Sequence, residues 1–170
     1  MEMYPGKISV AVFLSAFLPD STHKPSYVLE QYVELTPTEA WLDTEFKPFG
    51  DPEDHLTSMF FGPKFLASKL YNLCSPEDLA LAKMLVRPSS LFIEDLSKQN
   101  PFSEEGFGSV KRVYIMCRED RAILVDFQRW QIENSGVAEV KEIENADHMA
   151  MLSTPKELCQ FLLEIANNYA

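Results

Sequence analysis

The chain has 170 residues, of which 46% are apolar and 12% aromatic, so it is long and apolar enough to fold around one sizeable core. Its net charge of −11, without a cluster of lysines and arginines, excludes the basic surface that nucleic-acid-binding proteins use. The longest apolar runs are too short to span a bilayer and residues 1–7 lack the pattern of a signal peptide, so we expect a cytoplasmic protein without membrane contact.

The first predicted element is a strand over residues 8–17 (ISVAVFLSAF), an apolar run that suits a parallel strand covered on both faces. Residues 20–100 contain no strand-like run. They hold helix-start signals instead, namely the capping boxes at 36–39 (TPTE) and 75–78 (SPED) and the pair Gly62-Pro63. We therefore predict a helical insertion in this part of the chain.

The insertion is dense in large aromatic and methionine side chains. They are Tyr27, Tyr32, Trp41, Phe46, Phe49, Met59, Phe60, Phe61 and Phe65. Two interpretations stay open at this point. The side chains form the insertion's own small core, or they form a lid over an apolar ligand pocket.

The last third of the chain reads as strand, helix, strand, loop and helix, which is typical of a parallel α/β sheet. Residues 112–117 (RVYIMC) predict a second buried strand, and residues 138–143 (AEVKEI) predict a weaker, edge-like one. An amphipathic helix is predicted over 124–134 between them. Residues 154–157 (TPKE) form a third capping box, with proline at the first position of the final helix.

Three cysteines, Cys74, Cys117 and Cys159, are widely spaced and odd in number. This arrangement fits neither a disulfide framework nor a zinc site. We predict buried thiols in a reducing compartment, no metal and no cofactor.

Candidate catalytic side chains follow the second and third predicted strands. Residues 118–120 (RED) come directly after the second strand, and His148 follows the third. Both positions lie at the carboxyl edge of a parallel sheet, and an acid before a histidine fits the serine, acid, histidine order of α/β hydrolases. In such a triad the acid orients the imidazole, which deprotonates the serine. The alternative is a loop carboxylate and a structural histidine.

The sequence does not supply a serine nucleophile of the usual kind. A serine on a strained strand-to-helix turn needs a G-x-S-x-G pattern, and none of the six glycines forms it. Residues 106–109 (GFGS) come closest, but they lead into a strand and we predict a turn. Cys117 lies at an apolar strand end, where inert packing is expected and not a substitute nucleophile.

Several long strings of the sequence resemble the plant methylesterase family. They are residues 13–20 (FLSAFLPD), 28–32 (VLEQY), 56–92, 107–115 (FGSVKRVYI) and 146–152 (ADHMAML), and the resemblance covers essentially the whole chain. The family includes salicylate-binding esterases, methyl jasmonate esterases, polyneuridine aldehyde esterase and, more distantly, the plant hydroxynitrile lyases. The resemblance implies the C-terminal part of an α/β-hydrolase fold. Its expected parts are a helix end and core strand at 1–19, a helical cap insertion at 20–105 and a C-terminal α/β core at 106–170.

The resemblance also implies roles for individual residues. Asp120 in CRED matches the triad acid, and His148 in ADHM matches the triad base. The residues that match the family's acyl pocket are Phe17, Tyr32, Trp41, Phe46, Met59, Leu91 and Met149. Met149 favours the esterases, because the lyases place a lysine directly after the histidine. The implied ligand is a small apolar carboxylic acid or its methyl ester, such as methyl salicylate, methyl jasmonate or methyl indole-3-acetate.

The family's serine elbow and oxyanion loop precede the segment that matches Met1. The resemblance therefore implies an N-terminally truncated member, which we expect to be inactive alone. The strand over 8–17 would lack one neighbour, which favours aggregation or pairing with another chain, and the sequence leaves a homo-oligomer open. Relatives usually have Ile-Pro where this chain has Ile123-Leu124, which predicts a less rigid acid loop. A non-catalytic salicylate or jasmonate binder and a degenerate lyase relative are the alternative functions.

Overall fold

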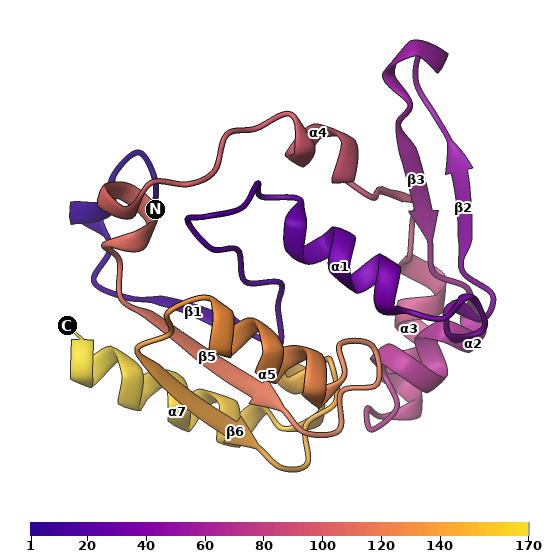
Figure 1. Ribbon diagram of the computed structural model, residues 1–170. Helices are drawn as coiled ribbons and strands as arrows, with labels where there is room; N and C mark the ends of the chain where they lie inside the picture. The colour runs from indigo at the N-terminus through magenta and orange to yellow at the C-terminus, as the bar shows by residue number, and fades with distance from the viewer. Residues whose placement is uncertain (170) are drawn as a thin grey trace.

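A three-stranded parallel sheet forms one half of the computed structural model, which describes residues 1–169 (Figure 1). The strand order is β1-β5-β6, with β1 at Ala11–Leu14, β5 at Arg112–Cys117 and β6 at Glu139–Ile143. The central strand β5 is buried at every position, because it has a neighbour on each side and helices on both faces. The predicted α/β class and the parallel direction of the three strands are confirmed.

β1 is shorter than the strand predicted over residues 8–17. It is preceded by a 3-10 turn, Pro5–Lys7, and it ends where Ser15 takes a φ of 38°. This left-handed value turns the chain away from the extended conformation of a strand. The apolar run continues instead as a connecting segment that buries Leu18 completely.

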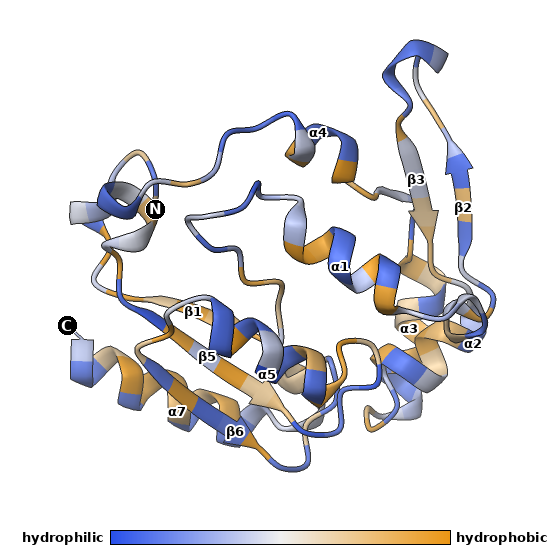
Figure 2. Ribbon diagram, viewed as in Figure 1, coloured by the Kyte–Doolittle hydropathy of each residue, from blue (hydrophilic) through white to orange (hydrophobic). Residues whose placement is uncertain are grey.

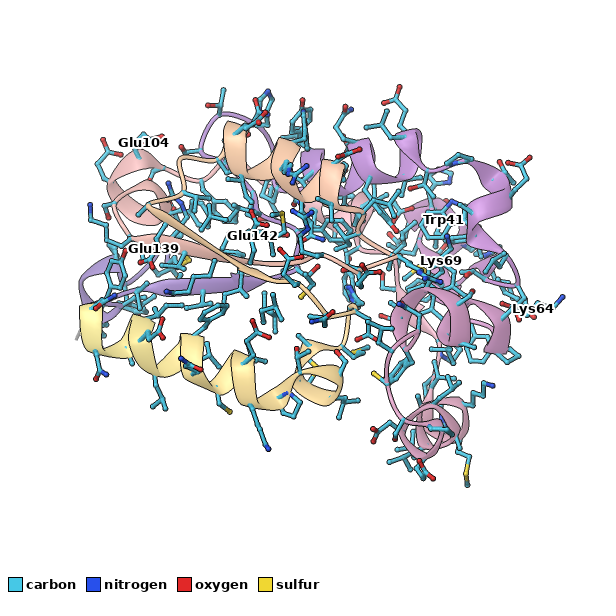
Figure 3. All side chains as sticks on the ribbon, turned by 90° about the horizontal axis from the view of Figure 1, so that it is seen from below. Trp41, Lys64, Lys69, Glu104, Glu139 and Glu142 are labelled. Atoms are coloured by element: carbon cyan, nitrogen blue, oxygen red, sulfur yellow. The ribbon has the colours of Figure 1, made fainter. Side chains whose placement is uncertain are left out.

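Helices cover the two faces of this sheet. α5 (Val125–Asn134) lies on one face and α7 (Pro155–Tyr169) on the other, as Figure 3 shows from below. The buried core facing α7 consists of Val113, Ile115, Cys117, Ile143, Ala146, Ala150, Leu158 and Ile165. The predicted helices after residues 124 and 154 are confirmed. The side chain of Thr154 does not cap α7, however, but donates back to the Ala150 carbonyl, at the end of α6 (Ala150–Ser153).

β6 is one of the two edge strands of the parallel sheet, and charged side chains lie along it. Lys141 Nζ lies 3.2 Å from Glu139 Oε1 and 3.0 Å from Glu164 Oε2 on α7. Figure 3 labels Glu139 and Glu142 along the same strand. Charges of this kind protect an edge against pairing with another chain.

Most of the chain between β1 and β5 forms a cap beside the parallel sheet, while its last turn, Glu104–Gly108, lies near the N-terminus (Figure 1). The helices of this part of the chain are α1 (Tyr27–Leu35), α2 (Pro63–Phe65), α3 (Pro76–Leu85) and α4 (Ile93–Ser97), with 3-10 turns at Thr38–Trp41 and Pro52–Asp54 and π-helical turns at Leu66–Leu70 and Glu104–Gly108. The predicted start at residues 75–78 is confirmed, since the Asp78 N–H donates to Ser75 Oγ at 3.1 Å. The prediction of a capping box at 36–39 is wrong. The Thr36 hydroxyl donates back to the Tyr32 carbonyl at the end of α1, and only a 3-10 turn follows.

The prediction that the insertion lacks strands is also wrong. An antiparallel sheet in the order β2-β3-β4 is formed by β2 (Glu45–Pro48), β3 (Thr57–Phe60) and β4 (Ser89–Ser90). The β2-β3 hairpin projects from the body, and its tip is hydrophilic (Figure 2). β2 is exposed at every position, so it never needed the apolar run by which buried strands are recognised.

The start of α2 depends on a close approach between Gly62 and Asp43. The Asp43 carboxylate accepts hydrogen bonds from the N–H groups of Lys64 (2.8 Å) and Phe65 (2.9 Å), which satisfies the first turn of the helix. A Cβ atom on Gly62 would overlap Asp43. Because residue 62 has no Cβ atom, the Asp43 carboxylate can reach the first turn of α2, the helix that places Phe65 in the interior.

The three cysteines differ in their surroundings. Cys117 is buried and Cys74 is half-buried, but Cys159 is exposed on the outer side of α7. The prediction of a buried thiol is therefore wrong for Cys159. No helix within residues 1–169 is long and apolar enough to cross a membrane.

Candidate functional site

Asp120 and His148 meet at the carboxyl edge of the parallel sheet. Asp120 follows β5 and His148 follows β6, and His148 Nδ1 lies 2.8 Å from Asp120 Oδ2. The Asp120 side chain is fully buried, whereas that of His148 is 25% exposed. Because Nδ1 faces the acid, Nε2 is the nitrogen left for a substrate or a nucleophile.

Three further donors fix the Asp120 carboxylate. Oδ1 accepts the N–H groups of Ala122 (2.7 Å) and Ile123 (2.9 Å), and Oδ2 also accepts the Ser15 hydroxyl (2.5 Å). The loop after the acid is thus held by the acid itself as far as Ile123. A carboxylate with its lone pairs filled in this way has little freedom to rotate.

Two fully buried glutamines on α5 hold the strand ends beneath the pair. The Gln128 amide accepts the Cys117 N–H at 3.1 Å and donates to the carbonyls of Cys117 (3.1 Å) and Ile123 (2.7 Å). Gln131 Oε1 accepts the Leu18 N–H at 2.8 Å, beyond the end of β1. Sequence reasoning missed both residues, because polar positions on an amphipathic helix are ordinarily solvent-facing.

The buried carboxylate of Asp147 ties the cap to the loop that carries His148. It accepts the N–H groups of Leu73 (2.8 Å) and Met149 (3.0 Å), and the Cys74 thiol lies 3.3 Å away. Burial, together with the thiol's hydrogen bond to Asp147, raises the pKa of Cys74 to about 12. This role could not be predicted from the sequence, since a loop aspartate next to a histidine is common.

An apolar cavity of about 540 Å³ lies against His148, between the sheet edge and the cap. The predicted pocket residues that line it are Phe17, Tyr32, Trp41, Met59, Leu91 and Met149. Phe46 does not line it. It lies on exposed β2 and packs its ring edge-on against Trp41, with centroids 5.1 Å apart. Trp41, labelled in Figure 3, lies at the opposite end of the molecule from Glu104.

Further lining residues were not singled out for the pocket. They include Phe61, Phe65, Leu66, Leu70, Tyr71, Leu81, Leu85 and Leu152. Phe61 and Phe65 stack in parallel at 4.7 Å, and Trp41 stacks on Phe65 at 6.2 Å. Phe65, Leu66 and Leu70 are also the buried core of the cap. Part of the aromatic cluster is therefore the core of the cap, and one side of this core is the cavity wall. That the cavity takes a ligand stays a prediction.

Few polar groups face the cavity. The Tyr32 hydroxyl donates to the Ala122 carbonyl at 3.0 Å, and burial, aided by the negative charge of Asp120, raises the pKa of Tyr32 to about 12. Within residues 1–169 the lining contains no serine, threonine or cysteine. Burial also raises the pKa of the Cys117 thiol to about 12, so it is poorly suited to act as a nucleophile. No cluster of three or more metal-ligating side chains occurs in the described part of the chain.

A second cavity, of about 350 Å³, lies between α1 and α5. Its walls include Leu35, Phe127 and Trp130, with Lys69 and Arg121 among its charged members. It shares Tyr32, Phe65 and Ala122 with the first cavity but does not include His148. Of these two cavities, His148 therefore lines only the larger one.

The chain is similar in sequence to plant proteins of known name. It is 69% identical over 169 residues to salicylic acid-binding protein 2 of Nicotiana tabacum and 52% identical over 168 residues to polyneuridine aldehyde esterase of Rauvolfia serpentina. Each alignment covers 99% of this chain, but the chain spans only 65% and 64% of the two relatives. No model of a protein family matches the chain.

Solved structures show the same arrangement of the backbone. The crystal structure of polyneuridine aldehyde esterase matches with a TM-score of 0.94 at 53% identity, covering 98% of this chain and 65% of that one. Tomato methylketone synthase I complexed with 2-tridecanone matches with a TM-score of 0.87 at 42% identity, covering 100% of this chain and 66% of that one. The parallel sheet, helices and cap thus correspond to about two thirds of an α/β-hydrolase structure.

Proposed function

We propose a carboxylic ester hydrolase function for this chain, which belongs to the plant methylesterase family of α/β hydrolases. The observation that carries the proposal is the contact between His148 Nδ1 and Asp120 Oδ2 at the wall of a large apolar cavity. An acid, an oriented imidazole and an apolar acyl pocket are the parts that ester hydrolysis requires beside the nucleophile and oxyanion hole.

In the proposed reaction, His148 Nε2 takes the proton of a serine hydroxyl while the serine oxygen attacks the ester carbonyl. His148 then returns this proton to the departing methoxide, which leaves as methanol. A water molecule, deprotonated by the same imidazole, releases the acid from the acyl-enzyme and restores the serine. Asp120 holds the tautomer and stabilises the imidazolium in both steps.

The serine in this scheme is not among the cavity residues of the described chain. We place it, with the oxyanion donors, in the part of the relatives' length that this chain does not span. The isolated chain should accordingly bind the ligand without hydrolysing it, and hydrolysis is a property of the whole protein.

The proposed substrates are methyl esters of small apolar acids. Salicylate is favoured because a relative at 69% identity carries salicylic acid binding in its name. Methyl jasmonate and methyl indole-3-acetate fit the same apolar lining on similar terms, because one methylene changes selectivity only modestly in such a pocket. A cytoplasmic location and a homo-oligomeric state stay predictions from the sequence.

A non-catalytic binding protein is the second candidate, favoured by the lining without a nucleophile in residues 1–169. A lyase function is disfavoured, because Met149 packs in the apolar cap cluster at the position next to the histidine. A cation there would have to be buried beside leucine and phenylalanine side chains.

Two assays separate the candidates. Calorimetric titration of the chain with salicylate should show saturable binding, and methyl salicylate should not release methanol in a His148-dependent manner. In the whole protein, His148→Ala should lower kcat by about a thousandfold or more. His55→Ala, in the exposed turn before β3, is the matched control and should keep full activity. Undiminished hydrolysis by the His148→Ala protein would reject the esterase proposal, and binding without hydrolysis by the whole protein would establish the binder.

A further inference from the structure

We infer that Ser15 is a positioning residue that sets the proton affinity of His148 through Asp120. This inference rests on the proposed function only in treating Asp120 and His148 as the acid and base. Ser15 lies 105 residues from Asp120 in the sequence, yet its hydroxyl donates to Asp120 Oδ2 at 2.5 Å. That oxygen is the one that faces His148 Nδ1, so the serine and the histidine share it.

The backbone around Ser15 is held so that the hydroxyl points at the acid. Its N–H continues the strand ladder by donating to the Ile115 carbonyl at 2.9 Å. Beyond it, the Tyr114 hydroxyl donates to the Ala16 carbonyl at 3.0 Å, and the Ser135 hydroxyl donates to the Leu18 carbonyl at 3.2 Å. The segment is thus fixed from β5 and α5, the elements that also carry and support the acid.

The backbone conformation and the burial of Ser15 indicate that a hydroxyl is needed at this position. Its φ of 38° lies in the left-handed region, where glycine is preferred over any residue with a Cβ atom. The side chain is almost completely buried, so water does not compete for the hydroxyl. A strained and buried serine therefore occupies a position that glycine would fill more easily, and its hydroxyl contacts the candidate acid.

A donor on Oδ2 changes the chemistry of the pair. The Ser15 hydroxyl stabilises the negative charge of the carboxylate, and so it weakens the attraction of that charge for a protonated imidazole. Removing the hydroxyl should make the carboxylate a stronger partner of the imidazolium and raise the pKa of His148. The two N–H groups on Oδ1 would still hold the acid in place.

Other titratable groups surround the pair, and substitution at residue 15 replaces none of them. They are Asp147, Asp78, Tyr32, Tyr71, Tyr114 and Cys117. The Ser15 hydroxyl also contacts the Cys117 thiol. Burial raises the pKa of this thiol to about 12, so it stays uncharged in the range where a histidine titrates, and a difference between variants reports the serine hydroxyl on Asp120.

The test is an NMR titration of the His148 ring in the purified chain and in Ser15→Ala and Ser15→Gly. Both variants should raise the His148 pKa by about half a unit or more, a threefold gain in proton affinity. The variants should differ in stability, since glycine relieves the left-handed strain and alanine keeps it. Ser15→Gly thus keeps the test decisive where Ser15→Ala does not fold.

Ser135→Ala is the matched control, since Ser135, at the end of α5, supplies another buried hydroxyl that contacts the segment after β1 but does not touch Asp120. It should leave the His148 titration unchanged. An unchanged pKa in both Ser15 variants, or an equal shift in Ser135→Ala, would overturn the inference. The readout needs no hydrolysis, so a whole protein that fails to cleave esters would reject the proposed function and leave this coupling standing. In an active whole protein, Ser15→Gly should move the acidic limb of the kcat/KM profile to higher pH by the same amount.

Discussion

Replacing Asp147 by asparagine tests whether a buried carboxylate joins the cap to the loop of His148. The side chain is fully buried and accepts the N–H groups of Leu73 and Met149, with the Cys74 thiol as a third neighbour. Asparagine keeps one acceptor oxygen, but it removes the charge and turns an NH₂ group toward another donor. A hydrogen bond to a charged group contributes about 1.5–3 kcal/mol, and a buried donor left without a partner costs about 1–3 kcal/mol.

We therefore expect Asp147→Asn to lower the free energy of unfolding by about 2–4 kcal/mol. For a chain of this size the melting temperature should fall by about 5–15 °C. Amide hydrogen exchange should accelerate at Leu73 and Met149 before the centre of β5 is affected, because the cap would loosen locally.

The matched control is Asp126→Asn, whose side chain is 98% exposed and makes only a loose contact with Arg129. It should change stability by less than about 0.5 kcal/mol. If Asp147→Asn were equally mild, and the Leu73 amide kept its protection, the carboxylate would not be what holds the cap.

Three further predictions concern the cavity and the thiols. A thiol reagent at pH 8 should modify Cys159 rapidly and Cys74 and Cys117 only on unfolding, because burial raises the pKa of both to about 12; mass spectrometry that found Cys117 modified in the folded chain would refute this. Tyr32 has a pKa of about 12 in the fold against an ordinary value of 10, so its contribution to stability is complete below pH 10 and is lost as the pH rises toward 12. Tyr32→Phe should flatten the fall in stability over that range, measured by denaturant unfolding at each pH, and an unaltered slope would contradict the assignment. Met149→Lys should weaken the binding of the uncharged ester methyl salicylate by about tenfold or more in calorimetry, because it places a charge in the apolar wall, and an unchanged affinity would remove Met149 from the pocket.

Much of the parallel core could be predicted from the sequence because its elements are locally patterned. β5 is a continuous apolar run buried at every position, and α7 begins at a proline one residue after a threonine. Where the signal is local, as at Gly62-Pro63 and residues 75–78, the helix starts were predicted correctly. The β2-β3 hairpin was missed because β2 is exposed at every position and β3 is only half-buried, so neither strand needs a continuous apolar run.

Only part of the candidate site could be predicted from the sequence, because some of its contacts join residues that are far apart along the chain. Asp120 and His148 could be named because each lies in the loop after a strand and because their order matches a known triad. Ser15 and Asp147 could not, since their partners lie 105 and 74 residues away and only the folded chain joins them. Phe46 was predicted to line the cavity but does not. Its ring packs against Trp41, which does line the cavity, and the sequence does not distinguish these two positions.

A crystal structure of the chain with methyl salicylate bound is the most direct test of the central claim, that Asp120 and His148 serve an apolar acyl pocket. The account predicts the aromatic ring between Phe17, Trp41 and Met149, with the ester group facing His148 Nε2 and the contact between His148 and Asp120 retained. Ligand in the second cavity between α1 and α5, or an ester group turned away from His148, would contradict it.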